Sequence, residues 1–313
     1  MSLVVSIINY KTADLTISAA SSVIEVLGSR DARVIIIDNG SGDESVELIE
    51  EWIRILGDER LLLLRSKENL GFSGGHNRVI AHVGSVDFLL LLNSDAILKP
   101  GFFDAIFLAV TSHPTVGVVA PRLEWEDGIP QESCFRLAGP ASEFIRGAET
   151  GAFTRIFSKY RVALGTQPVR SEVEWVSFAC VLLRGEMISR YGVMDEGYIL
   201  YFEDCEYCFR ARRAGWDILF EPGAKAIHIR GGSGPVKSRS AARERLPEYY
   251  WRSRTRFFRQ VHGPSGPLRA NLAWILGRSI SNCRRALGLS WASSRRRERF
   301  DILKGFLNPL QRR

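Results

Sequence analysis

Polar residues that could do chemistry stand directly after three apolar runs in this 313-residue chain. They are Asn9-Tyr10, Asp38-Asn39-Gly40-Ser41 and Asn93-Ser94-Asp95. If each run is a parallel strand, these residues meet at the carboxyl edge of one sheet, where open α/β sheets bind ligands. Asp38 could then accept the N3–H of uracil or thymine, and Asp95 could hold a divalent cation that clamps a pyrophosphate. A strand-end Asp can equally be a turn or helix-cap residue.

A glycine-rich stretch, residues 71–75 (GFSGG), precedes a predicted helix over residues 74–83. Glycines there would let the backbone approach a ligand closely at a helix start. The stretch is neither the GxGxxG fingerprint nor a Walker A sequence. An ordinary turn between a strand and a helix is therefore an equally good interpretation.

A second group of candidates lies at residues 201–206 (YFEDCE), where three acids open a predicted helix over residues 203–214. Acids at a helix start can simply complement the helix dipole. A carboxylate beside aromatic rings can also be poised as a general base. His228 ends the last predicted core strand before a glycine loop, which favours a metal or phosphate role.

The first half of the chain has the strand and helix pattern needed to position these residues. Strands are predicted at residues 3–9, 33–38, 61–65, 87–93 and 116–121, and helices at residues 12–27, 43–56, 74–83 and 100–112. Fully apolar strands that alternate with helices are typical of a mostly parallel sheet. The fold class is therefore predicted as α/β, with a Rossmann-like, mostly parallel central sheet flanked by helices.

The second half of the chain is less regular. Residues 122–170 contain Gly, Pro and polar residues without a clear period, which is typical of a functional loop or lid. Regular patterns return at residues 173–183, 186–191, 203–214, 217–220 and 225–229, and two basic helices are predicted at residues 244–261 and 268–287.

Composition limits the class of protein. The chain is 45% hydrophobic and 25% charged, which excludes a disordered, collagen-like or coiled-coil protein. Its apolar runs are shorter than a membrane-spanning helix needs, and its first residues lack a basic n-region, so a cytoplasmic protein is expected. The five cysteines predict neither a disulfide framework nor a zinc site.

The charge is unevenly distributed. Residues 230–313 contain 20 Lys and Arg against 4 Asp and Glu, whereas the other 229 residues have a net charge of −9. A basic region of this kind indicates an anionic partner: a membrane surface, a nucleic acid or a polyanionic substrate. Because it mixes arginines with aromatic and aliphatic residues, we expect its helices to lie on an anionic membrane surface, although packing on the catalytic domain or a dimer contact is the alternative.

Several stretches together resemble family 2 glycosyltransferases of the GT-A fold, most closely bacterial rhamnosyltransferases. They are VVSIINY (4–10), IIDNGSGD (36–43), NLGFSGGHN (69–77), LLLNSDA (90–96), WVSFACVLLR (175–184), GVMDE (192–196) and YFEDCEYCFRARRAG (201–215), with His228. The resemblance covers residues 3–232. We therefore expect a catalytic domain at 1–232, with a nucleotide-sugar half at about 1–121 and an acceptor half at about 122–232, followed by a basic helical region at 233–313.

The resemblance implies an inverting sugar transfer, with Asp204 as catalytic base and Glu203 as a supporting residue. A divalent metal, Mg²⁺ or Mn²⁺, is implied at Asp95 and His228; Asn93 stands at the first acidic position of the family's Asp-x-Asp motif. The implied donor-nucleotide residues are Asn9, Tyr10, Asp38, Asn39, Gly71, Phe72, Asn77, Asn93 and Ser94. The implied acceptor-side residues are Trp175, Ser177, Phe178 and Ala179.

The expected donor is dTDP-rhamnose, with a UDP-sugar second, and the expected acceptor is a hydroxyl of a glycan or lipid-linked glycan in cell-wall or polysaccharide biosynthesis. The expected location is the cytoplasm, at the inner face of the cytoplasmic membrane, and an oligomer is possible. Galactofuranosyl transfer is the nearest alternative. A sugar-1-phosphate nucleotidyltransferase is less favoured, because no Gly-rich, Arg-containing loop follows the first strand. A nucleic-acid-binding protein is also disfavoured, because no recognition motif accompanies the basic region.

Overall fold

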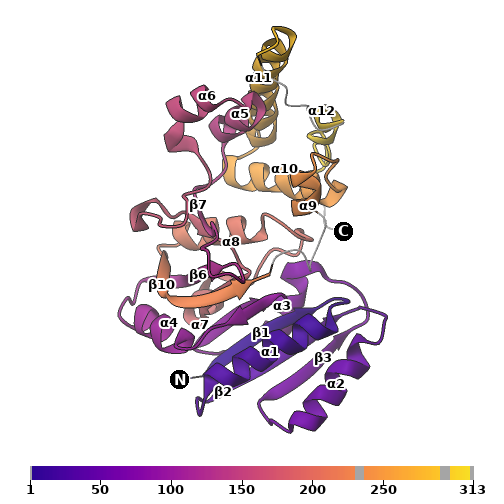
Figure 1. Ribbon diagram of the computed structural model, residues 1–313, viewed down its shortest axis with the longest axis vertical. Helices are drawn as coiled ribbons and strands as arrows, with labels where there is room; N and C mark the ends of the chain where they lie inside the picture. The colour runs from indigo at the N-terminus through magenta and orange to yellow at the C-terminus, as the bar shows by residue number, and fades with distance from the viewer. Residues whose placement is uncertain (1, 230–235, 290–296, 311–313) are drawn as a thin grey trace.

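The fold is built on one eight-stranded sheet, as a computed structural model of the chain shows (Figure 1). The structure describes residues 2–229, 236–289 and 297–310. The strand order is β3-β2-β1-β4-β9-β6-β10-β5. The strands are β1 (Leu3–Asn9), β2 (Ala32–Asn39), β3 (Leu61–Ser66), β4 (Phe88–Asn93), β5 (Ala96–Leu98), β6 (Val116–Glu124), β9 (Cys180–Arg184) and β10 (Asp217–His228).

The sheet is mostly parallel, as predicted. β1 to β4 run parallel to one another, and β6 runs parallel to β10. β9 is antiparallel to both β4 and β6, and β5 is antiparallel to β10. The register pairs Asn9 with Asp38, so the first two polar clusters do meet at one edge of the sheet.

Helices cover both faces of the sheet, because successive side chains of a strand point to opposite faces. Residues of α1 (Ala13–Leu27), α2 (Ser45–Leu56) and α4 (Phe102–Thr111) pack with Val5 and Ile7 on one face. Residues of α3 (Gly71–Val83), α7 (Gly185–Tyr191) and α8 (Glu203–Arg213) pack with Val4 and Ile35 on the other. Both faces of the central strands are therefore buried, which explains their fully apolar sequences.

Helices far apart in sequence form a second layer above the sheet (Figure 1). They are α5 (Pro140–Ala148), α6 (Gly151–Ile156), α9 (Val236–Ala241), α10 (Glu248–His262), α11 (Gly266–Ala286) and α12 (Glu298–Asp301). α5 and α11 pack closely through two glycines: a Cβ on Gly147 would collide with the Trp274 carbonyl, and one on Gly277 with the Phe144 carbonyl. The expected acceptor half thus packs directly against the basic region.

Three elements differ from their predictions. Residues 122–170 are not a continuous loop, because they contain β7 (Cys134–Phe135), α5, α6 and a 3-10 turn at Ser158–Tyr160, with another at Arg170–Glu172. The two strands predicted at 217–220 and 225–229 are one strand, β10, with an irregularity between Glu221 and Lys225. Trp175–Val176 forms β8, which pairs with β7 instead of continuing into β9.

The membrane-lying helix expected at residues 244–261 is buried in part. Trp251, Phe257 and Phe258 of α10 are fully buried against the rest of the protein, so the expectation that they meet a membrane is wrong. α11 differs, because Leu268, Leu272, Ile275 and Leu276 form an exposed face while Trp274 points inward. Among the helices that the structure describes, none has the length and apolarity to cross a membrane.

Candidate active site

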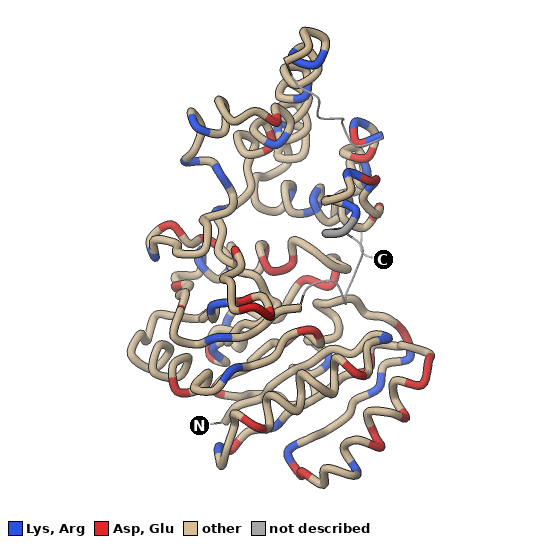
Figure 2. The backbone as a smooth tube through the Cα atoms, viewed as in Figure 1, with Lys and Arg blue, Asp and Glu red and all other residues tan. Residues whose placement is uncertain are grey.

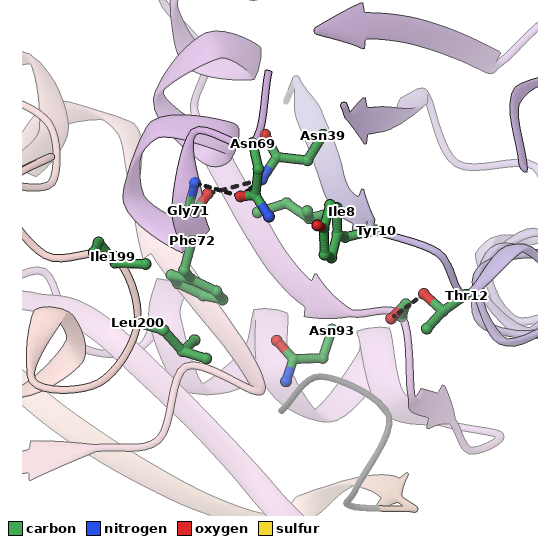
Figure 3. Close-up of a pocket in the computed structure, with 11 residues that line it drawn as sticks. Ile8, Tyr10, Thr12, Asn39, Asn69, Gly71, Phe72, Asn93, Ile199 and Leu200 are labelled. Carbon is green, nitrogen blue, oxygen red and sulfur yellow. Dashed lines mark hydrogen bonds between the residues drawn. The ribbon is translucent and has the colours of Figure 1, made fainter. Parts of the chain in front are cut away.

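A cavity of about 140 Å³ opens at the carboxyl edge of the sheet (Figure 3). The rings of Tyr10 and Phe72 and the amides of Asn39, Asn69 and Asn93 face it from three different elements and their loops. It thus combines apolar surfaces with hydrogen-bonding groups, as expected for a nucleoside site. Its lining residues are Ile8, Tyr10, Thr12, Asn39, Asn69, Gly71, Phe72, Asn93, Ser94, Ile199 and Leu200.

Asn39 holds the glycine-rich stretch against this cavity. Its Nδ2 donates to Asn69 Oδ1 at 3.2 Å and to the Gly71 carbonyl at 3.1 Å, and its Oδ1 accepts from the Leu70 N–H at 3.0 Å. Gly71 has a φ of +71°, and a Cβ there would lie 2.5 Å from the Ile199 carbonyl oxygen. That carbonyl accepts from the Phe72 N–H at 2.9 Å. Glycine is needed at position 71 for this close approach of two backbones.

Asn9 and Asp38 are not among the residues that line the cavity. Asn9 Nδ2 donates to Asp38 at 2.8 Å, and the Ser41 backbone N–H donates to the other carboxylate oxygen at 3.1 Å. The Ser41 hydroxyl also donates to Asp38, and both Asn9 and Asp38 are buried. These contacts fix the strand ends that carry the cavity. A direct contact of Asp38 with a base remains a prediction.

Asn77, an expected donor-nucleotide residue, is hydrogen-bonded to the loop that precedes α8. Its amide donates to the Met194 carbonyl at 2.9 Å and to Glu196 at 3.0 Å, and its Oδ1 accepts from the Met194 N–H at 3.1 Å. It does not line the cavity. Asn77 therefore connects α3 to the loop between α7 and α8.

Asp95 and His228 are brought together as expected. Ala96 of β5 pairs with His228 of β10, and His228 Nε2 lies 3.3 Å from an Asp95 carboxylate oxygen. Both side chains are buried. A carboxylate oxygen suits Mg²⁺ or Mn²⁺, whereas an imidazole nitrogen favours a transition metal such as Mn²⁺ over Mg²⁺. Asn93 and Ser94 of the same strand end line the cavity. Among the described residues no set of three or more His, Cys, Asp or Glu could hold a metal.

Asp204 lies in a second cavity of about 430 Å³. Its Oδ1 accepts from the Cys205 N–H at 2.8 Å, at the first turn of α8. Aromatic rings dominate the walls, with two arginines among them. The lining residues are Ala138, Ser142, Glu143, Ile145, Arg146, Tyr160, Arg161, Val162, Trp175, Tyr201, Phe202, Asp204, Cys205 and Tyr250.

Glu203 has a different environment from its neighbour. It is buried, and among the described residues its Oε2 has no hydrogen-bond partner. Burial and the adjacent Asp204 charge raise the pKa of the Glu203 carboxyl well above its usual range. Burial therefore favours the protonated form of Glu203, whereas a proton acceptor has to be ionised.

The acceptor-side residues separate into two groups. Trp175 lines the second cavity, stacks on Phe135 with a centroid distance of 4.2 Å, and donates from Nε1 to the Arg136 carbonyl. Phe178 and Ala179 are core residues, and the Ala179 carbonyl accepts from the Asn93 N–H at 2.8 Å. Ser177 pairs through its backbone with Ser133. The last three therefore support the site without lining this cavity.

Sequence analysis missed several lining residues. Ile199 and Leu200 line the first cavity, and Arg146, Arg161 and Tyr250 line the second. Arg146 is on α5 and Tyr250 on α10, far from Asp204 in the sequence, so no local pattern relates them to the site. Asn69 stood within the glycine-rich match and could have been found from it.

The family comparison agrees with this geometry. Residues 2–151 match the model of the family described as "Glycosyl transferase family 2". The N-acetylglucosaminyl-diphospho-decaprenol L-rhamnosyltransferase of Mycobacterium tuberculosis is 26% identical over 295 residues, which cover 88% of this chain and 90% of that protein. The low-salt glycan biosynthesis hexosyltransferase Agl10 of Haloferax volcanii is 23% identical over 71% of this chain and 65% of its own length.

Solved structures share the fold. The mannosyltransferase PcManGT of Pyrobaculum calidifontis, in complex with GDP-Man and Mn²⁺, superposes with a TM-score of 0.61 at 16% identity over 93% of this chain and 76% of that one. GalNAc-T7 with UDP, GalNAc and Mn²⁺ gives a TM-score of 0.60 at 15% identity, over 99% and 59% of the two chains. The chain is therefore a glycosyltransferase with a GT-A fold, and its sequence is similar to family 2 glycosyltransferases and to a rhamnosyltransferase.

Proposed function

We propose that this glycosyltransferase moves rhamnose from dTDP-rhamnose to a hydroxyl of a lipid-linked glycan, with inversion at the anomeric carbon. One observation carries the proposal: the two cavities border consecutive residues of one loop. Ile199 and Leu200 line the first cavity, and Tyr201 and Phe202 line the second. A donor in one and an acceptor in the other would meet at this loop, as a single displacement requires.

The first cavity takes the donor nucleoside. Tyr10 and Phe72 offer aromatic surfaces to the base, and the amides of Asn39, Asn69 and Asn93 offer hydrogen bonds. Asn9 and Asp38 fix the strand ends that carry it. A thymine and a uracil present the same N3–H, so a UDP-sugar is the second choice of donor.

Asp95 and His228 are the residues that would hold the divalent metal. A bound Mg²⁺ or Mn²⁺ supplies positive charge that stabilises the departing nucleoside diphosphate. Mn²⁺ in the complexes of the two structural neighbours supports this assignment. The chain's own contribution is a buried carboxylate and imidazole at adjoining strand ends.

Asp204 is the base that takes the proton of the acceptor hydroxyl. It lies in the second cavity, whose aromatic walls suit the apolar faces of a sugar ring. Glu203 supports it as a neighbouring acid whose burial favours the protonated form. The diphospho-lipid acceptor in the name of the M. tuberculosis relative supports a lipid-linked acceptor here.

A lipid-linked acceptor lies in a membrane, so we place the enzyme on the cytoplasmic face of an anionic membrane. The exposed Leu268, Leu272, Ile275 and Leu276 of α11 form the contacting face, in place of the α10 aromatic residues. The excess of 20 basic over 4 acidic residues in 230–313 complements anionic lipid.

A donor screen tests the proposal. Purified protein is incubated with dTDP-rhamnose, UDP-galactofuranose, UDP-glucose and GDP-mannose, with Mg²⁺, Mn²⁺ or a chelator, and nucleoside diphosphate release is measured. We expect dTDP-rhamnose to give the fastest metal-dependent release, and a diphospho-lipid N-acetylglucosamine acceptor to accelerate it. Preference for UDP-galactofuranose would contradict the assignment of rhamnose as the transferred sugar. Full activity with chelator would contradict the proposed requirement for a divalent metal.

A further inference from the structure

A buried ion pair joins the basic C-terminal region to the loop between α7 and α8. Arg256 of α10 donates to the Asp195 carboxylate from Nε at 2.9 Å and from Nη2 at 2.9 and 2.7 Å. Gln260, one turn later, donates to the same carboxylate at 2.7 Å. The two charged side chains are only 7% and 15% exposed. A guanidinium that meets a carboxylate through two nitrogens fixes the orientation of both segments.

Asp195 remains a charged partner inside this contact. Burial alone would raise the pKa of its carboxyl, but hydrogen bonds from Gln260, the Gly197 N–H and Arg256 lower it below its ordinary value. Loss of the guanidinium would leave a buried carboxylate short of a partner, and the loop would have to move to restore its solvation.

The loop that Arg256 holds borders both cavities. Ile199 and Leu200 line the donor cavity, and Tyr201 and Phe202 line the cavity of Asp204, which follows them directly. Neither Arg256 nor Asp195 lines these two cavities. An effect of the ion pair on transfer would therefore be indirect, and the loop that Asp195 belongs to is the segment that borders both cavities.

The conformation of the loop depends on its surroundings. Tyr201 and Phe202 both have a φ of 72°, in the left-handed region that residues with a side chain seldom adopt. Such conformations persist only where neighbouring contacts determine them. Gly197 also packs directly against the Arg256 guanidinium, where a Cβ would collide with it.

α10 supplies contacts along the whole loop. The Tyr198 hydroxyl donates to Gln260, and the Ser253 hydroxyl donates to the Leu200 carbonyl at 3.3 Å. The Phe202 ring lies 5.4 Å from the Phe257 ring, centroid to centroid. On the opposite side α3 holds the loop, through Asn77 and through the Phe72 N–H. The loop is thus fixed between α3 and α10.

We propose that Arg256 is a positioning residue for sugar transfer, which sets the 195–202 loop so that the donor cavity is closed and Asp204 is presented to the acceptor. This inference rests on the proposed function of the two cavities. It gives the basic region a role inside the catalytic unit, separate from any attraction to anionic lipid.

Two variants of one helix test the proposal. Arg256→Gln removes the guanidinium, while Arg252→Gln is the matched control, since Arg252 lies one turn earlier, is 51% exposed and pairs with Glu248 on the surface. We expect Arg256→Gln to lower kcat at least about tenfold and to weaken dTDP binding in calorimetry at least about threefold. Arg252→Gln should stay within about twofold of the natural protein in both measurements. Arg256→Lys keeps the positive charge but cannot donate to the carboxylate through two nitrogens, so its kcat and dTDP affinity should lie between those of the two other variants. It replaces Arg256→Gln in the test if that variant does not fold.

Two further readouts separate positioning from simple stability. Amide hydrogen exchange of residues 196–202 should rise in Arg256→Gln while exchange in β1, β2 and β4 stays unchanged. In Arg256→Ala, millimolar methylguanidinium should restore kcat severalfold, whereas tetramethylammonium at the same concentration should not. A variant that is merely less stable would show natural kcat per folded molecule and no such rescue.

Natural kcat and natural dTDP affinity in folded Arg256→Gln would overturn the proposal. The failure of the proposed function would look different, because the natural protein itself would then neither bind dTDP nor release a nucleoside diphosphate from any donor. The comparison of variant with natural protein therefore distinguishes the two failures.

Discussion

At the scale of single residues, two adjacent acids at the start of α8 have opposite environments. Glu203 is buried and its pKa is raised by burial and by the charge of Asp204. Asp204 borders a cavity that is large enough for a sugar. A proton acceptor must be ionised and within reach of the substrate, so the geometry favours Asp204.

Asp204→Asn should therefore remove the base while preserving the shape of the cavity. A positioned base contributes about 10²–10⁴-fold in rate, so we expect turnover to fall at least about a hundredfold. Binding of dTDP, measured by calorimetry, should be unchanged because the donor cavity has other walls. Glu203→Gln, which resembles the protonated acid, should retain most turnover. A larger loss in Glu203→Gln than in Asp204→Asn would reverse the two roles.

His76 makes the fold sensitive to acid. The His76 ring is completely buried, and its Nδ1 lies 2.7 Å from the Ser6 hydroxyl oxygen. Burial lowers the pKa of the His76 imidazole from 6.5 to about 3. The unfolded chain therefore binds a proton below pH 6.5 that the folded chain does not, and the free energy of unfolding falls as pH falls from 6.5 towards 3. The slope approaches about 1.4 kcal/mol per pH unit. Urea unfolding between pH 7 and 5 should show a shallower slope for His76→Asn than for the natural protein.

The exposed His82 on the same helix supplies the control for this measurement. His82→Asn should keep the slope of the natural protein. Equal slopes for His76→Asn and the natural protein would show that His76 does not stay neutral in the folded state.

At the scale of elements, the local pattern predicted what depends on local sequence. β1, β2 and β4 were predicted within a residue or two, because their apolar runs are buried on both faces. The antiparallel insertion of β9 between β4 and β6 was not predicted, since strand order depends on long-range packing. α5 was missed because its partner, α11, lies more than a hundred residues away and contacts it through Gly147 and Gly277.

The turn into α3 allows a direct test of backbone approach. Gly71 and Gly84 flank the same helix and both have positive φ, but only at Gly71 would a Cβ meet another backbone, 2.5 Å from the Ile199 carbonyl. Gly84→Ala should lower the free energy of unfolding by about 1–3 kcal/mol, because the φ of +68° at this position is unfavourable for alanine. Gly71→Ala should lower the free energy of unfolding by roughly a further 1–3 kcal/mol, because the new Cβ would collide with the Ile199 carbonyl. It should also weaken dTDP binding, because Gly71 lines the proposed donor cavity. Urea unfolding and calorimetry measure both, and equal effects of the two variants would exclude the close approach.

At the scale of the whole molecule, the basic region contains both buried and exposed arginines, which its composition could not separate. Figure 2 shows Lys and Arg on α10 and α11 at one end of the molecule and acidic residues along α2 at the other. Some arginines of this region are structural: Arg254 is buried against Glu143, and Arg256 against Asp195. Charge counting predicted an anionic partner but could not tell these buried arginines from the exposed ones.

The residues of the candidate site that lie at strand ends could be predicted from the sequence. Asp95 and His228 were expected together, and an Asp95 carboxylate oxygen lies 3.3 Å from His228 Nε2. Asn39, Phe72 and Asn93 line the first cavity. The residues of α5 and α10 that line the second cavity were not predicted, because no local pattern relates Tyr250 to Asp204. Phe178 and Ala179 were assigned to the acceptor from their place in a matching stretch, although they are core residues.

The exposed face of α11 yields a prediction about the whole enzyme at a membrane. Burying one leucine side chain contributes about 1.5–3 kcal/mol, and each basic residue near an anionic surface adds about 1 kcal/mol. We therefore expect the protein to float with vesicles that contain phosphatidylglycerol and to float poorly with purely zwitterionic vesicles.

Leu272→Asp, at a position 57% exposed, should lower the partition coefficient at least about tenfold, since it removes apolar area and adds repulsion. Leu108→Asp is the matched control, because Leu108 is 69% exposed on α4, at the opposite end of the molecule from α11 (Figure 1). Its partitioning should equal that of the natural protein. If the natural protein does not float with either vesicle and light scattering finds a dimer that Leu272→Asp dissociates, the face binds a second copy of the chain and the membrane assignment is wrong.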